Sequence, residues 1–205
     1  MTSDFSAMVG VLKEGRRVIN NIENVASLYL VKTIYSVILT VYYMFIPYAY
    51  PFTPLQMTPI NMFTVGIPSF FLALRPLYDK PRGKFLTNVI ENSLSAAVTI
   101  VIGILAVRLI SVIFCLPEAN ISTINMIITA TVGFTILLKV SKPLGTSEVV
   151  MISMLVAAFI GTITGFTGFL GYDFETSMLP YLAIVAASPL LFHFMSKRLA
   201  INTSQ

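Results

Sequence analysis

Six apolar runs, each about as long as a bilayer crossing, constrain the fold of this chain more than any motif. A membrane-spanning helix needs about 20 apolar residues, and hydrophobic residues make up 56% of the chain while charged residues make up only 11%. The sequence therefore predicts an all-α, polytopic membrane bundle with six transmembrane helices and a short N-terminal stalk helix. The runs lie near residues 26–48, 57–74, 93–114, 123–139, 149–170 and 179–194.

Lysine and arginine positions predict the orientation of this bundle. Basic residues cluster next to the runs on one side, whereas the three opposite loops contain neither Lys nor Arg. Because cytoplasmic loops are enriched in Lys and Arg, both termini are expected in the cytoplasm. The net charge of +4 is distributed by topology and needs no nucleic-acid partner. The predicted organisation is a stalk at residues 1–24, six spans within residues 25–198 and a cytoplasmic tail at residues 199–205.

The second run contains three residues that disturb helices, namely Pro59, Gly66 and Pro68. Asn61 and Thr64 lie between them. Proline removes a backbone donor and glycine loosens the helix, so we expect an interruption near mid-membrane that frees carbonyl groups. Since hard cations prefer oxygen ligands, the run indicates an ion or substrate path. A kinked packing helix is the alternative, because Pro and Gly are common in membrane helices.

The first run contains a lysine in the expected bilayer core. A lysine at the centre of a membrane helix costs about 2.5–3.5 kcal/mol, so Lys32 is expected to face the bundle interior or to snorkel to the cytoplasmic surface. Thr33 lies beside it. Polar residues on the same face of this helix form a stripe, which indicates either a transport path or hydrogen bonds between helices. Helical spacing forms this polar stripe from Tyr29, Lys32, Ser36, Thr40 and Tyr43.

The other runs are less informative. None of the six contains Asp or Glu, and a divalent-cation site usually includes a carboxylate. Arg108, near the outer end of the third run, is expected to snorkel to the interface or to pair with Glu118. Small residues in the fourth and fifth runs indicate close helix packing. They are Thr129, Thr131, Thr135, Gly161, Thr162, Thr164, Gly165, Thr167 and Gly168.

Several motifs resemble the C-terminal membrane half of P-type ATPases. G-R-R-V-I-N-N-I at residues 15–22 is similar to the stretch through which that family's phosphorylation domain leads into its fifth membrane helix, and S-D-F at residues 3–5 is similar to the stretch before it. P-x-Q-x-x-x-x-N-x-x-T-x-G-x-P at residues 54–68 is similar to the sixth helix. K-T-x-Y at residues 32–35 and T-x-G-I-P-x-F-F-L-A-L at residues 64–74 resemble a bacterial subgroup linked to calcium.

The resemblance implies that the six runs are the fifth to tenth membrane helices of a bacterial P-type cation-transporting ATPase in the plasma membrane. Val65 stands where the family has Asp, which disfavours a two-calcium site. The resemblance then indicates a single cation, with calcium favoured and Lys32 as a built-in countercharge. The family's cation ligands correspond here to Asn61 and Thr64, which are the candidate metal ligands of the second run, and to Thr33 and Ser36 in the first run.

The family's D-K-T-G and T-G-E motifs, its nucleotide-binding domain and its first four helices are missing from these 205 residues. We therefore expect either a fragment of a pump or a truncated reading frame that begins at Met1. No cofactor is expected in this chain, and Mg²⁺ and ATP would bind the missing N-terminal part. The alternative is a self-standing six-span transporter, channel or accessory subunit without ATPase activity, and a purely structural bundle is a third possibility.

Overall fold

The computed structural model describes residues 5–80, 85–114, 118–170 and 181–202, and the regular secondary structure in this part of the chain is helical throughout. The second predicted span is one helix with a π-helical turn inside it, because residues 54–61 and 67–74 are α-helical and residues 62–66 form the turn between them. The elements are α1 (Phe5–Met44), α2 (Pro54–Asn61), the π-helical turn η1 (Met62–Gly66), α3 (Ile67–Leu74), α4 (Phe85–Phe114), α5 (Glu118–Val140), α6 (Thr146–Gly165), α7 (Thr167–Leu170) and α8 (Leu182–Asn202).

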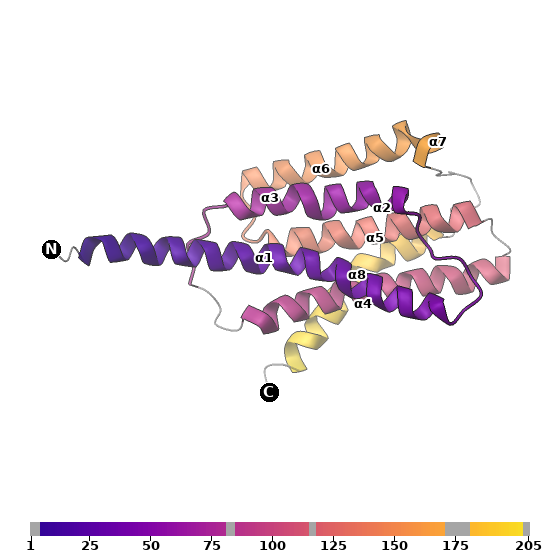
Figure 1. The fold of residues 1–205 in the computed structure, drawn as a ribbon, viewed down its shortest axis with the longest axis horizontal. Helices are drawn as coiled ribbons and strands as arrows, with labels where there is room; N and C mark the ends of the chain where they lie inside the picture. Colours follow the sequence, from indigo (N-terminus) through magenta and orange to yellow (C-terminus); the bar gives the residue numbers. More distant parts are fainter. Residues whose placement is uncertain (1–4, 81–84, 115–117, 171–180, 203–205) are drawn as a thin grey trace.

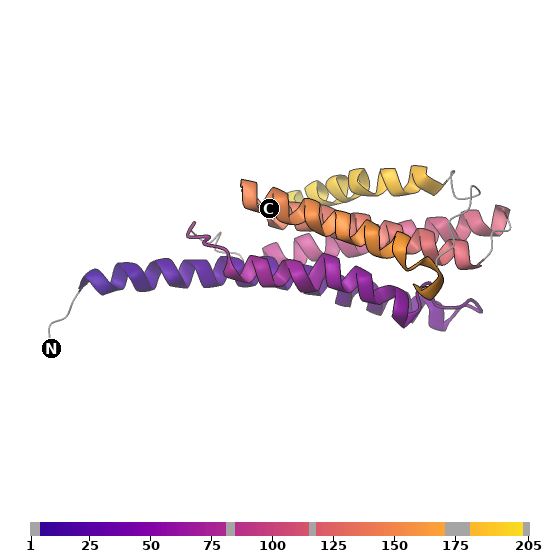
Figure 2. The ribbon, with the colours of Figure 1, turned by 90° about the horizontal axis from the view of Figure 1, so that it is seen from above.

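The long helices run side by side, and α1 begins at the same end of the bundle at which α8 ends (Figure 1). The first half of α1 projects beyond the other helices (Figure 1). Seen from above, α1 and the α2–η1–α3 helix lie on one side and α8 lies on the opposite side (Figure 2). Helix α4 packs against α1, α5 and α8, while α5 also contacts η1 and α6. The centre of the bundle is therefore formed by α4 and α5.

Five helical segments in the described residues are long and apolar enough to cross a membrane by length and composition. They correspond to the first five predicted runs, with α2, η1 and α3 forming a single span, Pro54–Leu74. The sixth predicted run lies in α8, which is helical over 21 residues but is not among the five. Its second half contains His193, Lys197 and Arg198, which shortens its apolar stretch.

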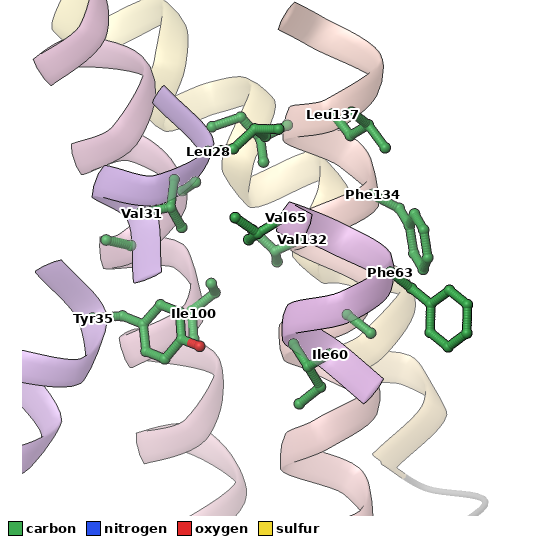
Figure 3. Close-up of a cluster of buried hydrophobic side chains, with 14 of the residues drawn as sticks. Leu28, Val31, Tyr35, Ile60, Phe63, Val65, Ile100, Val132, Phe134 and Leu137 are labelled. Atoms are coloured by element: carbon green, nitrogen blue, oxygen red, sulfur yellow. The ribbon is translucent and has the colours of Figure 1, made fainter. Parts of the chain in front are cut away.

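Helix α1 continues without interruption from the predicted stalk into the first predicted span. Residues 1–4, which include most of the S-D-F motif, lie outside the described residues. One face of the helix, formed by Leu28, Val31, Tyr35 and Leu39, is buried in the bundle. Figure 3 shows Leu28, Val31 and Tyr35 facing apolar side chains of the second span and of α4 and α5. Burial of this face, rather than helix propensity, anchors α1.

One contact of Arg108, near the end of α4, is with an aromatic ring. Its guanidinium lies over the ring of Tyr48, 3.8 Å from the ring centroid. Tyr48 belongs to the segment between α1 and α2, so this cation–π contact ties the end of α4 to that segment. The side chain of Glu118 lies outside the described residues.

Candidate functional site

The second span does not unwind at its proline and glycine residues, although the sequence predicts an interruption there. It forms the π-helical turn η1, in which the Ile67 N–H donates to the carbonyl of Met62, five residues earlier. Pro68 follows and has no N–H to donate. The ladder around Thr64 therefore lacks the donor that Pro68 cannot supply, and π-helical turns are frequent at functional sites.

A glycine in α5 allows this turn to approach closely. A Cβ added at Gly133 would lie 2.9 Å from Cγ2 and 3.0 Å from Cβ of Thr64, closer than real Cβ atoms are found. Thr64 is buried, and its Oγ1 donates to the carbonyl of Ile60 at 2.7 Å. The hydroxyl group and the π-helical backbone of Thr64 are thus held against α5.

A small cavity lies between α1, η1, α4 and α5. Its volume is about 20 Å³, which is enough for a single water-sized particle. No Asp or Glu lines it. Most of its wall is apolar, including Leu28 and Ile100. Its polar lining comes from Lys32, Asn61, Thr64 and Thr129.

Three of the predicted site residues, Lys32, Asn61 and Thr64, thus meet around one cavity. Lys32 and Asn61 are half-buried there. The arrangement supplies neutral oxygens next to a backbone that lacks a donor, and both are ligands for a hard cation. Among the described residues that line the cavity, Lys32 alone carries a formal charge.

The structure does not bring Thr33 and Ser36 to this cavity. Thr33 is exposed on the other side of α1, and its Oγ1 donates to the carbonyl of Tyr29 at 3.2 Å. Ser36 is half-buried towards the segment that follows α1. There, burial raises the pKa of Tyr50 above its usual value, although hydrogen bonds with Thr40 and Ser36 oppose the rise.

Helix α5 contributes polar groups that the sequence analysis treated only as packing residues. Thr129 lines the cavity, and its Oγ1 donates to the carbonyl of Asn125 at 2.8 Å. Asn125 is 1% exposed, and both polar atoms of its side chain lack a partner among the described residues. About one turn before Asn125, the Ser122 hydroxyl donates to Gln56 Oε1 in α2. A buried asparagine four residues before a threonine was the available sequence signal.

Two asparagines of the G-R-R-V-I-N-N-I motif bind the end of the second span. Asn21 Nδ2 donates to the carbonyl groups of Ala73 and Arg75 at 3.0 and 2.8 Å. Asn20 Nδ2 donates to the carbonyl of Asp79 at 2.8 Å, just beyond α3. These bonds satisfy carbonyl groups that a helix C-terminus leaves without donors. The motif therefore joins α1 to the helix that carries Asn61 and Thr64.

Arg75, directly after α3, joins three elements. Its Nη1 donates to the carbonyl of Ser141 at 2.8 Å, and its Nη2 donates to the carbonyl of Pro143. Its Nε lies 3.0 Å from Oε1 of Glu148 in the first turn of α6. Arg75, one of the basic residues from which the orientation was predicted, is thus also a structural tie.

The described residues contain no cluster of three or more His, Cys, Asp and Glu side chains that could hold a metal ion. The backbone and side-chain oxygens around η1 are consequently the best ligands that this part of the chain offers to a cation. Together, the fold and the site define a multi-span helical membrane protein with a polar cavity beside a π-helical turn.

Known proteins with similar sequences belong to one class. The chain is 30% identical over 170 residues to the probable cation-transporting ATPase exp7 of Streptococcus pneumoniae, an alignment that covers 79% of this chain and 22% of that protein. It is 34% identical over 110 residues to the calcium-transporting ATPase CtpE of Mycolicibacterium smegmatis, covering 49% of this chain and 14% of that protein. CtpE of Mycobacterium bovis is 36% identical over 103 residues, with 45% and 13% covered.

The homologues of this chain are thus P-type cation-transporting ATPases, which confirms the resemblance seen in the motifs. The chain spans about a fifth or less of the length of these relatives. No protein-family profile matches it.

Proposed function

We propose that this chain is the membrane-transport half of an ATP-driven cation pump, and that its six runs are the fifth to tenth membrane helices. The observation that carries the proposal is the meeting of Lys32, Asn61 and Thr64 around one cavity beside a π-helical turn. The relatives named as cation-transporting ATPases support the same assignment. In the whole pump, Mg²⁺ and ATP act on the part that precedes this chain.

The transported cation binds to a set of uncharged oxygens in this proposal. Asn61 and Thr64 supply ligands from the cavity, and the missing fourth helix supplies the others. Thr33 and Ser36 do not line the cavity, so they are not among the ligands in this proposal. Calcium is the favoured cation, because two of the relatives are named calcium-transporting ATPases.

Lys32 acts as a built-in countercharge. Its ammonium group lines a cavity that has no carboxylate, so it opposes binding of a second cation and stands in for one when the site is empty. Coulomb interactions are strong at short range in a low-dielectric interior. A charge fixed on the cavity wall would therefore affect both stoichiometry and selectivity.

Coupling to phosphorylation passes through α1. The helix extends from the predicted stalk to Lys32 without a break, and Asn20 and Asn21 bind it to the end of α3. A movement of the phosphorylated domain that tilts the stalk would consequently move α3 and η1 with it. This link explains how a change outside the membrane can reach Asn61 and Thr64.

The test uses the full-length pump with Asn61→Ala or Thr64→Val. Each variant removes one ligand oxygen, and a hydrogen-bonding or charge-assisted contact of this kind corresponds to about a tenfold change in affinity. We expect the cation concentration for half-maximal phosphoenzyme formation to rise by about that factor. Thr58→Val is the matched control, because Thr58 is exposed on the same span and bonds only to the Pro54 carbonyl. An equal effect in all three variants would remove the site from the proposal.

Lys32→Ala tests the countercharge separately. The expected result is an altered ratio of cations transported per ATP, or altered selectivity between monovalent and divalent cations, measured by flux into inverted vesicles. Unchanged stoichiometry and selectivity would refute the role of Lys32 and leave the ligand assignment standing.

A self-standing transporter, channel or accessory subunit is the competing function, and polypeptide size separates the two. An antibody against the tail should detect a band several times larger than 22.5 kDa in source membranes. A band at 22.5 kDa would mean that ATP-driven transport requires a separate partner chain.

A further inference from the structure

A large cleft that shares no lining residue with the cation-site cavity lies among α4, α5 and α8. Helix α8 ends at the end of the bundle at which α1 begins (Figure 1). The cleft opens between the start of α4, the end of α5 and the second half of α8, and its volume is about 690 Å³. Neither the transport site nor the coupling contacts described above use it.

The walls of this cleft are rich in basic groups. Lys139 comes from α5, Lys142 from the segment after α5, and Lys197 from α8. His193 lies on the same wall as Lys197. Glu91 is the one acidic residue that lines the cleft, so positive charge predominates among the described lining residues.

Lys139 is held in position at the cleft. Its Nζ donates to Ser196 Oγ on α8 and lies 5.5 Å from the centroid of the Phe192 ring. Both contacts leave the ammonium group at the boundary between α5 and α8. Lys142 and Lys197 are exposed at the rim. The cleft thus combines one ammonium group held by contacts with two exposed ones, a set that suits an anion with several oxygens.

Apolar side chains supply a floor beside the charges, while neutral polar side chains such as Asn88 and Asn92 also line the cleft. Leu138, Leu144 and Pro189 belong to the floor, and two of the three helices around the cleft are apolar enough to cross a membrane. A molecule that fits must therefore place an anionic group against lysines at a membrane surface and hydrocarbon directly below. Basic clefts between transmembrane helices bind anionic lipid head groups for this reason.

We propose that this cleft binds the phosphate head group of an anionic phospholipid of the phosphatidylglycerol class. The phosphodiester lies between the three lysines, and the acyl chains run along the apolar floor towards the bilayer. A free phosphate would satisfy the lysines but not the floor. The proposal rests on the membrane location of the chain and not on its assignment to a pump.

The test measures lipid binding by native mass spectrometry on the full-length protein in detergent. Phosphatidylglycerol and phosphatidylcholine with identical acyl chains are compared, and the paired substitution Lys142→Gln with Lys197→Gln is made in the cleft. Each basic residue near an anionic surface contributes about 1 kcal/mol, so the pair should weaken phosphatidylglycerol binding about thirtyfold, or about 2 kcal/mol at 1.4 kcal/mol per factor of ten. Phosphatidylcholine binding should not change.

The matched control is the pair Lys13→Gln with Lys80→Gln, which removes the same charge from exposed positions outside the cleft. It should leave phosphatidylglycerol binding within about twofold, since distant exposed charges are screened. The pair Lys142→Arg with Lys197→Arg keeps the charge and should retain binding. If a glutamine variant does not fold, the preference of the unaltered protein for phosphatidylglycerol decides alone.

Three results would overturn the proposal. One is equal binding of the two lipids, which would mean that the cleft is closed in the whole protein or ignores charge. Another is an equal loss in the control pair, which would mean diffuse surface attraction. The third is full displacement of phosphatidylglycerol by an equal concentration of inorganic phosphate, which would assign the lysines to a free anion.

Discussion

Helices α5 and α6 follow one another in the chain and have similar compositions, but their surroundings differ. In its most apolar stretch, 67% of α5 is buried in the bundle, against 22% of α6. Gly133 of α5 meets Thr64 at contact distance, whereas a Cβ at Gly161, Gly165 or Gly168 would meet nothing within 4 Å. Among the described residues, no helix therefore packs closely against these glycines, of which Gly161 and Gly165 belong to α6 and Gly168 to α7.

Threonines show the same contrast. Thr129 of α5 lies on the cavity wall, while Thr162 and Thr164 of α6 donate only to carbonyl groups of their own helix in the hydrogen bonds that the structure defines. Small and hydroxylated residues in a membrane helix thus indicate a compatible surface and not a partner. The neighbouring helix decides whether they serve packing, ligand binding or neither.

The largest expected effect that would sharpen this comparison is in Gly133→Val. The new side chain would collide with Thr64, and overpacking of this kind costs about 1–3 kcal/mol. We expect a clear loss of monodisperse protein after heating in detergent. Gly161→Val, in open space on α6, should leave thermal stability nearly unchanged. Equal losses in the two variants would contradict the close approach of η1 and α5.

A smaller effect is expected where α6 is tied to the bundle. Glu148→Gln removes the ion pair with Arg75, whose partner side chains are only 10% and 15% exposed. The cost should be about 1 kcal/mol, and hydrogen exchange should accelerate in the first turn of α6 without a change in α5. Glu14→Gln, which breaks the more exposed pair with Arg17, is the control and should have no effect. Faster exchange throughout α5 would mean that the tie holds more than α6.

The smallest effect distinguishes the threonines of the two helices. Thr129→Val removes a hydroxyl group from the cavity wall. A contact of this kind contributes about 0.5–1 kcal/mol, so the half-maximal cation concentration of the full-length pump should rise about threefold. Thr164→Val, on the exposed face of α6, should leave it unchanged. If Thr164→Val has the larger effect, the cavity beside η1 is not the ion site.

Hydrophobic patterning was sufficient to predict the helical bundle, because the length of an apolar run is set by the bilayer. Lys32 was predicted to face the interior, and it does line the cavity. The form of the second span could not be predicted. Proline and glycine indicate that the helical hydrogen bonds are disturbed, but they do not decide between an unwound segment and a π-helical turn. That choice depends on the approach of α5, which is a contact between residues far apart in sequence.

The sequence also could not predict which groups the polar side chains contact. The sequence offers Arg108 the interface or Glu118, and the contact with the ring of Tyr48 became visible only in the structure. The two asparagines before the first span were seen as a motif, and their hydrogen bonds to α3 became visible only in the fold. In each case the local pattern names a residue that needs a contact, and the tertiary arrangement decides which group provides it.

The contacts of Asn21 with the end of α3 also restrict how α1 can turn about its own axis. Lys32 follows Asn21 by eleven residues, which is about three helical turns, so both side chains share a rotational phase. Inserting a single residue between them would rotate Lys32 by about 100° away from the cavity while Asn21 kept its bonds. The rotation of α1 about its own axis is therefore set by the spacing of Asn21 and Lys32, and this restriction does not prevent the helix from tilting.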